Sequence, residues 1–298
     1  MIMEITFLGT SSMVPTKERN QSAVFVSYKN EGILVDCGEG TQRQFKQKGI
    51  SLTKITKILI THWHGDHVFG LPGVMSTLGA SEYQKTLEIY GPKDTKKHLE
   101  SMFDAFIFDR RINFVVKEIK GGKFFENKDF YLEALPLEHG IETLGYNFVE
   151  KDIIHIDVKK TKKLGIPSGP LLGKLQDNEA VSFNGKEVSP KEVTYVEKGK
   201  KISIIADTVP CNNAVKLAED ADVLICEATY SSKLEEKGEE YGHMTGKQAG
   251  LIANQANVKK LVLTHFSARY RTTEEVEEDA KSVFNDSIAA KDFMVVRL

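Results

Sequence analysis

One stretch, residues 58–73 (ILITHWHGDHVFGLPG), constrains this chain more than any other. Its apolar start, residues 58–60, has the character of a buried strand. Three histidines and one aspartate follow within six positions: His62, His64, Asp66 and His67. Imidazole nitrogens and a carboxylate crowded onto one loop are ligands that Zn²⁺ prefers. The stretch therefore predicts a metal site directly after a strand, where α/β folds place their chemistry.

Composition excludes several classes of protein. The chain has 298 residues, 41% of them hydrophobic and 28% charged, which is typical of a globular protein and not of a disordered one. No apolar run approaches the ~20 residues that span a bilayer. Residues 1–10 lack a basic region, so we expect no secretory signal. The three cysteines are odd in number and widely spaced, which favours a reducing, cytoplasmic location over a disulfide scaffold.

Strands and helices alternate along both halves of the chain, which predicts an α/β fold with two sheets and outer helices. Strands are expected at residues 3–8, 23–27, 32–36, 57–60, 87–90, 112–116, 123–125, 130–136, 145–149, 201–206, 221–226, 260–263 and 293–298. Helices are expected at residues 42–48, 68–78, 92–103, 210–220, 246–257 and 273–284. Asp66 is expected to cap the helix that follows the metal motif, and Thr245 the helix from 246.

The pattern of the opening stretch recurs elsewhere, because single ligand-type residues follow other apolar strands. His139 lies near the strand at 130–136, Asp207 ends the strand at 201–206, and His265 follows the strand at 260–263. A lone histidine is more often a hydrogen-bonded loop residue than a ligand. Together with the opening cluster, however, seven ligand-type residues at strand ends suit two metal ions, which can activate water and clamp a phosphodiester.

The chain resembles the metallo-β-lactamase superfamily through Thr-His-x-His-Gly-Asp-His and the later His, Asp and His. Within that superfamily it is similar to the tRNase Z (ribonuclease Z) family over nearly its whole length. The motifs that carry this likeness are Pro15-x-Lys17-x-Arg19-Asn20, Asp36-Cys37-Gly38-Glu39-Gly40-Thr41-Gln42, Gly70-Leu71-Pro72-Gly73, Leu137-Glu138-His139-Gly140, Ala206-Asp207-Thr208, Glu227-Ala228-Thr229, His243-Met244-Thr245 and Thr264-His265-Phe266-Ser267-x-Arg269-Tyr270.

The resemblance implies an αβ/βα sandwich, residues 1–298, of two mixed sheets flanked by helices. It implies that a first zinc binds His62, His64 and His139, that a second binds Asp66, His67 and His265, and that Asp207 bridges them. Asp66 would also orient or deprotonate the attacking water, and His243, supported by Glu227, would protonate the leaving oxygen. The implied reaction removes the 3′ trailer of precursor tRNA and leaves a 3′-hydroxyl on the tRNA and a 5′-phosphate on the trailer. No organic cofactor is implied.

Residues 150–190 change in character, being rich in Lys, Gly and Pro, and we expect an insertion with little core of its own. The segment resembles the family's flexible arm, which holds the tRNA body across a homodimer. Net charge is −2, so a local basic patch would have to bind the polyanion. The residues expected to contact substrate are Lys17, Arg19, Lys160, Lys163, Lys174 and Arg269.

Two other functions remain open from the residues alone. One is a superfamily hydrolase of a small phosphodiester, thioester or lactone, and the other is a metal-dependent nucleic-acid-binding protein without catalysis. The ligands also leave Zn²⁺ and Mn²⁺ as alternatives. Cys226 stands where the family has a histidine, and Met244 where it has a serine, so the proton relay is the least constrained part of the site.

Overall fold

The computed structural model describes residues 2–105, 107 and 111–298. The described chain divides into two compact units, which we treat separately. Unit 1 comprises Met1–Phe125, Leu132–Phe148 and Lys201–Leu298, and unit 2 comprises Glu126–Tyr131 and Val149–Lys200. Among the described residues no helix has the length and apolar character needed to cross a membrane.

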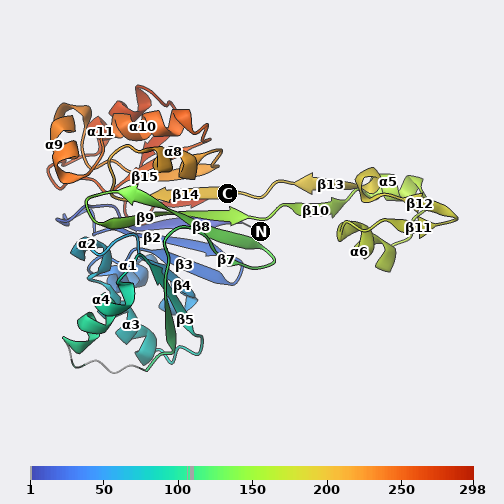
Figure 1. The fold of residues 1–298 in the computed structure, drawn as a ribbon, viewed down its shortest axis with the longest axis horizontal. Helices are drawn as coiled ribbons and strands as arrows, with labels where there is room; N and C mark the ends of the chain where they lie inside the picture. The colour runs from blue at the N-terminus through green and yellow to red at the C-terminus, as the bar shows by residue number, and fades with distance from the viewer. Residues whose placement is uncertain (1, 106, 108–110) are drawn as a thin grey trace. The chain divides into compact units, whose positions relative to one another are not determined.

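Unit 1 is built on two seven-stranded sheets (Figure 1). The first has the order β18-β1-β2-β3-β4-β5-β6 and the second the order β17-β16-β15-β14-β9-β8-β7. The first sheet's strands are β1 (Glu4–Gly9), β2 (Ala23–Tyr28), β3 (Glu31–Val35), β4 (Lys57–Leu59), β5 (Leu87–Gly91), β6 (Phe114–Glu118) and β18 (Val295–Arg297). The second sheet's strands are β7 (Gly122–Glu126), β8 (Phe130–Glu138), β9 (Glu142–Glu150), β14 (Lys201–Ile205), β15 (Val223–Glu227), β16 (Leu261–Thr264) and β17 (Ser287–Ala289).

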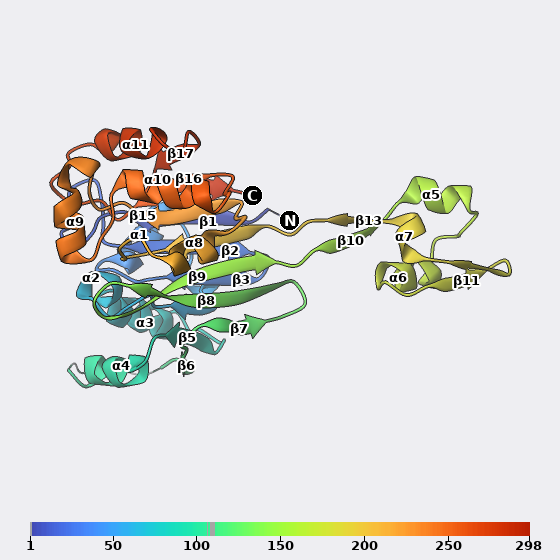
Figure 2. The same ribbon diagram turned by 45° about the horizontal axis from the view of Figure 1, so that its top comes forward.

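Helices lie against the outer face of each sheet (Figure 2). Those of the N-terminal half are α1 (Thr41–Lys48), α2 (Gly65–Val68), α3 (Leu71–Ala80) and α4 (Thr95–Asp104), with a 3₁₀ turn η1 (Leu52–Lys54). Those of the C-terminal half are α8 (Asn212–Ala218), α9 (Glu235–Tyr241), α10 (Gly246–Gln255) and α11 (Glu274–Lys281), with η2 (Ser232–Leu234). Each sheet has its own buried apolar layer against these helices. The predicted α/β architecture with two mixed sheets is confirmed.

Both sheets place parallel strands next to the site. β3, β4, β5 and β6 run parallel in the first sheet, and β14, β15, β16 and β17 run parallel in the second. Parallel neighbours end at the same edge, so residues that follow β4, β14 and β16 collect at the carboxyl ends of the strands. The expected cap at Asp66 is wrong, because α2 is capped by His64 and Asp66 lies in its first turn. The cap at Thr245 is confirmed, with Gln248 completing a capping box.

Unit 2 has more structure than the sequence indicates. It contains β10 (Ile153–Ile156), α5 (Val158–Lys163), α6 (Pro170–Gln176), β11 (Val181–Phe183), β12 (Lys186–Val188), α7 (Pro190–Val193) and β13 (Thr194–Glu197). Strands β10 and β13 pair antiparallel from Ile153↔Glu197 to Ile156↔Thr194. A small core buries Ile166, Leu175, Val181, Val188 and Val193. This core is small beside those of unit 1, in keeping with the expectation of little core. The short strands and helices were not expected, because single apolar residues spaced along them form no visible periodic run.

Candidate metal centre

The predicted ligands lie on loops and one short helix at the ends of four strands. His62 and His64 follow β4, His139 follows β8, Asp207 follows β14 and His265 follows β16. Asp66 and His67 lie on α2, directly after His64. The structure brings all seven together in two groups, one of His62, His64, His139 and Asp207 and the other of Asp66, His67, Asp207 and His265, each with ligand atoms within 4.8 Å of one another.

Close backbone packing fixes the loop that carries the histidines. The amide of Cys37 donates to the carbonyl of His67 at 2.7 Å, and the amide of Gly70 donates to the carbonyl of Cys37 at 2.8 Å. A Cβ at position 70 would lie 2.1 Å from the carbonyl oxygen of Gly38, so only glycine fits there. Two non-glycine residues of the site, Asp36 at φ 58° and His265 at φ 61°, adopt the left-handed conformation. Such strain is common where a side chain is aimed at a functional centre.

The first group points ring nitrogens at a common position. His64 Nδ1 lies 3.1 Å from His62 Nε2 and 3.2 Å from His139 Nε2. Asp207 Oδ2 lies 3.6 Å from His62 Nε2 and 3.5 Å from His139 Nε2. Three imidazoles and one carboxylate that converge in this way are four donors of the kinds that Zn²⁺ takes.

The second group shares Asp207 with the first. His67 Nε2 lies 3.4 Å from Oδ2 of both Asp66 and Asp207. His265 Nε2 lies 3.2 Å from Asp207 Oδ1 and 3.5 Å from Asp66 Oδ2. One carboxylate thus faces both groups, which is the arrangement that a bridging ligand requires.

Three buried atoms of the second group show that a cation fits. His67 Nε2, His265 Nε2 and Asp207 Oδ1 have no hydrogen-bond partner in the described part of the chain, although all are shielded from solvent. A buried polar atom without a partner is costly, so such atoms usually face an ion or an ordered water. The donor set and these orphaned atoms therefore fit metal ions at this position.

In four of the five imidazoles, the ring nitrogen that faces away from the metal group contacts a protein group. Asp36 Oδ2 lies 2.7 Å from His67 Nδ1, and the carbonyl of Gly242 lies 2.7 Å from His139 Nδ1. The hydroxyls of Thr61 and Thr229 lie 3.0 and 2.9 Å from Nδ1 of His62 and His265. Such partners fix the tautomer and direct the opposite nitrogen toward the metal. Sequence reasoning missed these roles, although Asp36 ends a strand as the predicted ligands do.

Charge within the cluster keeps the carboxylates ionised. Burial would raise the pKa of Asp207, but the neighbouring His265, His67 and His62 outweigh this and hold it well below its usual range. Burial would also raise the pKa of Asp66, but the neighbouring His265 and His67 outweigh this and lower it. Both carboxylates are therefore available as anionic ligands or acceptors near neutral pH.

His243 forms a separate pair with Glu227 beside the metal groups. Its Nδ1 lies 3.0 Å from Glu227 Oε1. Glu227 is fully buried and also accepts from the Thr208 amide at 2.8 Å and the Thr229 hydroxyl at 2.6 Å. Burial lowers the pKa of His243, but the charge and hydrogen bond of Glu227 outweigh it and raise the pKa to about 9. His243 is thus held as an imidazolium near neutral pH, as a proton donor requires.

Cys226 takes no part in this pair. Its side chain is fully buried in the apolar core, with Sγ 3.8 Å from Met244 Sδ. Successive residues of a strand face opposite sides of the sheet, so Glu227 points to the site while Cys226 points away. The two departures from the family pattern therefore lie against each other in the core.

One pocket is lined by residues of both metal groups and by His243. It has a volume of about 220 Å³, and both metal groups and His243 open into it. Its walls also include Ser12, Met13, Tyr230 and Tyr241. Met13 and Tyr241 expose 66% and 54% of their surface, so the pocket reaches solvent between apolar side chains.

The predicted substrate-binding residues are dispersed. Lys17 is exposed, and the exposed Arg269 lies 5.2 Å over the ring of Tyr230 at the pocket wall. Lys160, Lys163 and Lys174 are exposed on unit 2. Arg19 is buried, and its Nη2 donates to the carbonyl of Tyr270 at 2.7 Å. This bond holds the segment around Tyr270, and a contact of Arg19 with substrate stays a prediction.

Comparisons with known proteins cover the chain from end to end. A family model described as Anti-Pycsar protein Apyc1 matches residues 3–158. A ribonuclease Z of Methanothermobacter thermautotrophicus is 40% identical over 298 residues, which is 100% of this chain and 97% of that protein. A ribonuclease Z of Archaeoglobus fulgidus is 38% identical, covering 99% and 97%.

Solved structures give the same result. Human tRNase Z, short form, superposes with a TM-score of 0.73 at 30% identity, covering 98% of each chain. The metallo-β-lactamase fold protein YhfI from Bacillus subtilis superposes with a TM-score of 0.72 at 18% identity over 100% and 99% of the two chains. The predicted metallo-β-lactamase fold is confirmed by these likenesses. The Apyc1 model ends before Asp207, His243 and His265, whereas the ribonuclease Z relatives match through them.

Proposed function

Because this chain belongs to the ribonuclease Z family, we propose that it is the endoribonuclease that removes the 3′ trailer from precursor tRNA. The observation that carries this proposal is the pair of metal-ligating groups beside a pocket that His243 also lines, in a chain that matches ribonuclease Z along its whole length. A phosphodiester is cut by water when that water is activated, the phosphate charge is neutralised and the leaving oxygen is protonated. The pocket holds residues for each task.

Two zinc ions per subunit are the metals that we propose. His62, His64, His139 and Asp207 would hold one, and Asp66, His67, His265 and Asp207 the other. When bound, such ions lower the pKa of water toward 7 and neutralise charge on the phosphate. Five imidazoles around Asp207 favour Zn²⁺ over Mg²⁺ or Ca²⁺, which prefer oxygen ligands.

Asp66 is the residue that we assign to the attacking water. Its carboxylate lies at the second group, 3.4 Å from His67 Nε2 and 3.5 Å from His265 Nε2, and it is held ionised. An ionised carboxylate accepts a hydrogen bond from water and aligns it, and it can take the proton as the water attacks phosphorus.

His243 is the residue that we assign to the leaving group. Glu227 occupies its Nδ1, so Nε2 is the nitrogen left to donate a proton into the pocket. Donation to the 3′-oxygen leaves a 3′-hydroxyl on the tRNA and a 5′-phosphate on the trailer. The raised pKa keeps that proton in place until the bond to phosphorus breaks.

Binding of the tRNA body is the task that we propose for unit 2. Lys160 and Lys163 on α5 and Lys174 on α6 are exposed, and Lys–phosphate contacts bind RNA without reading its sequence. We also propose that two chains form a homodimer, so that the arm of one grips the tRNA cut by the other. The three free cysteines suit the cytoplasm, the compartment that we propose.

A cleavage assay with and without chelator tests the proposal. Purified protein should cut a precursor tRNA that carries a 3′ trailer, and a chelator should abolish the cut. Asp66→Ala and His64→Ala should each remove turnover while circular dichroism shows a folded chain. Absence of any chelator-sensitive cut, or substantial turnover by Asp66→Ala, would contradict the assignment.

A further inference from the structure

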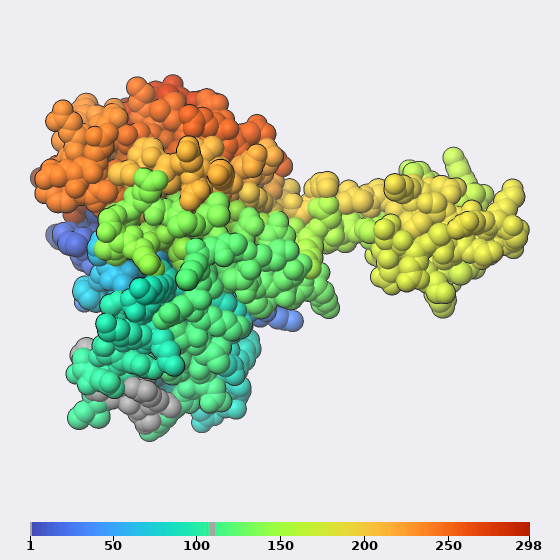
Figure 3. Space-filling view, viewed as in Figure 1, coloured from blue at the N-terminus to red at the C-terminus, as the bar shows by residue number. Residues whose placement is uncertain are grey.

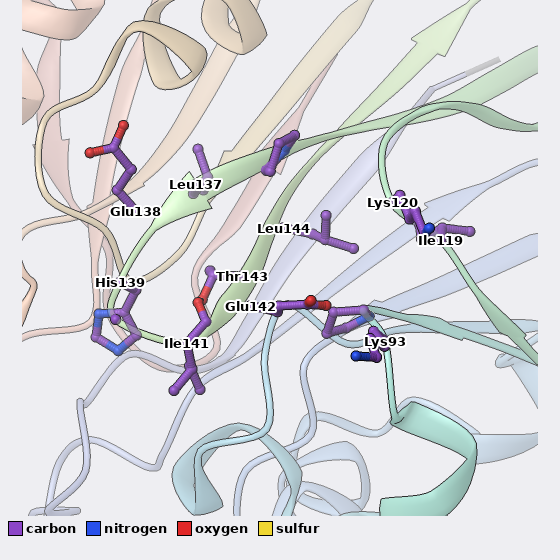
Figure 4. A pocket seen from close by; sticks show the side chains of 13 residues that line it. Lys93, Ile119, Lys120, Leu137, Glu138, His139, Ile141, Glu142, Thr143 and Leu144 are labelled. Carbon is purple, nitrogen blue, oxygen red and sulfur yellow. The ribbon is translucent and has the colours of Figure 1, made fainter.

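A second and larger pocket adjoins the metal centre. It has a volume of about 870 Å³ and is lined by three segments of unit 1: the β5–α4 connection at residues 92–93, the β6–β7 turn at residues 119–120, and the β8–β9 hairpin at residues 136–144. We call it the hairpin trough. His139 lines both the hairpin trough and the metal pocket, so the two spaces meet at a metal-ligating residue (Figure 4).

Two lysines mark the end of the hairpin trough away from the metals. Lys93 and Lys120 are exposed, and neither forms an ion pair with any residue that the structure describes. In Figure 4 they lie on the side opposite His139 and Glu138, while Glu142 lies between, toward Lys93. Ammonium groups without a protein partner in a groove that leads from a phosphodiester site are placed to contact backbone phosphates.

The wall between the metals and the lysines is partly apolar. Ile141 exposes 41% of its surface although it lies only two residues from His139. Ile119 and Pro136 line the same space. Apolar surface beside a charged track suits unpaired bases, because every base has a flat face that packs without regard to sequence.

The position of His243 assigns the hairpin trough to one side of the cut. The leaving 3′-oxygen belongs to the retained tRNA, so the tRNA end lies on the His243 wall, beside Tyr241 of α9. Figures 1 and 2 show the β8–β9 turn between α9 and α4, and Figure 3 shows the hairpin as a band between the C-terminal helices and the N-terminal half. The hairpin trough and the His243 wall, where the tRNA end lies, are therefore on opposite sides of the β8–β9 hairpin.

We propose that the hairpin trough binds the 3′ trailer, as single-stranded RNA whose 5′-phosphate lies at the metals and whose next phosphates contact Lys93 and Lys120. This rests on the proposed function and names a substrate site within it. Trailers that extend into the hairpin trough gain these contacts, and a trailer of one nucleotide does not.

Trailer length provides the test. Wild-type protein should cut precursors with trailers of six to eight nucleotides at a lower KM than precursors with a single extra nucleotide. Lys93→Ala/Lys120→Ala should remove this advantage and leave cleavage of the one-nucleotide precursor unchanged. It should also raise the inhibition constant of a free 5′-phosphorylated hexanucleotide about fivefold or more, and reduce the salt dependence of that inhibition by roughly 1.4 in log–log slope for two lost phosphate contacts.

Two further variants separate the proposal from a general charge effect. Lys216→Ala/Lys247→Ala makes the same change in net charge on α8 and α10, away from the hairpin trough, and should leave the inhibition constant unchanged. Glu142→Gln, which removes a negative charge from the hairpin trough, should lower the inhibition constant. An unchanged inhibition constant in Lys93→Ala/Lys120→Ala, or an equal loss on short and long trailers, would overturn the hairpin trough as a trailer site. Failure of the wild type to cut any precursor would instead overturn the proposed function.

Discussion

Among single residues, the pair of buried Glu227 and partly exposed His243 should set the pH range in which a proton can be donated. His243 must be protonated to act, so activity should fall as pH rises through its pKa. Glu227→Gln removes the charge that raises this pKa. We expect the alkaline limb of the kcat profile to move to lower pH by about one unit or more, as loss of a buried neighbouring charge commonly does.

An exposed carboxylate nearby is the control for this shift. Glu239→Gln on α9 removes a charge of the same sign without touching His243, and the alkaline limb should stay in place. If Glu227→Gln lowers kcat equally at every pH, Glu227 only positions His243 and the proton-donor assignment loses its support.

Asp292 is a second residue whose effect can be measured, because its protonation should change the free energy of unfolding. Burial raises its pKa to about 6, although the Asn20 amide and the Thr10 hydroxyl donate to it. Asp292 therefore binds a proton more tightly in the folded state than in the unfolded state, where its pKa is near 3.8. The stability that the group contributes is complete below pH 3.8 and is lost as pH rises through about 6.

Urea unfolding of the wild type and Asp292→Asn at several pH values checks this. The free energy of unfolding of the wild type minus that of the variant should fall between pH 4 and pH 7, by about 3 kcal/mol at most for a shift of about two units. Asp94→Asn is the control, because Asp94 is exposed and has a left-handed backbone that asparagine tolerates. A difference that does not change with pH would contradict the role of Asp292.

Single residues also show what the sequence could and could not predict about the site. His139, Asp207 and His265 could be found because each follows an apolar strand, and strand ends meet at one edge of the fold. Arg19 could not be placed, because its partner Tyr270 lies 251 positions away in the chain. The roles of Thr61 and Thr229 depend on which ring nitrogen faces the metal, which no sequence pattern encodes.

At the scale of elements, unit 2, to which we assign tRNA binding, should separate cleavage of precursor tRNA from cleavage of a small phosphodiester. Deletion of residues 157–193, with a short turn joining Ile156 to Thr194, would end the β10–β13 ladder at a paired position. We expect precursor tRNA cleavage to fall at least about tenfold, since several phosphate contacts are lost together. Cleavage of bis-p-nitrophenyl phosphate should stay near the wild-type rate.

A charge variant distinguishes lost contacts from lost structure. Lys160→Glu/Lys163→Glu/Lys174→Glu keeps the core of unit 2, because these side chains are exposed, and should reduce tRNA cleavage in the same selective way. Equal losses on tRNA and on the small phosphodiester, in either variant, would contradict a tRNA-binding role for unit 2.

The elements that were predicted and those that were missed differ in a physical property. The strands and helices of unit 1 that were predicted each bury several apolar residues at a regular period, whereas the short α9 and β17 were not predicted. The short elements of unit 2 bury one or two residues each, as Leu175 on α6 and Val193 on α7 show. A core assembled from such single contributions leaves no periodic signal in the sequence.

For the molecule as a whole, the site exists only where both halves meet. The N-terminal half supplies His62, His64, Asp66 and His67, and the hairpin of the second sheet supplies His139. The C-terminal half supplies Asp207, His265 and the His243–Glu227 pair. Two sheets whose strands end side by side thus assemble a centre that neither half contains, and the chemistry that we propose for it is hydrolysis by an activated water.

Cleavage in ¹⁸O-labelled water tests whether the nucleophile is water. A defined precursor tRNA is cut in H₂¹⁸O, and the released trailer and the tRNA end are analysed by mass spectrometry. If water attacks phosphorus, we expect one ¹⁸O atom in the 5′-phosphate of the trailer and an unmodified 3′-hydroxyl on the tRNA. A 2′,3′-cyclic phosphate on the tRNA, or a trailer with a 5′-hydroxyl, would show that the nucleophile is the ribose 2′-hydroxyl and would contradict the account.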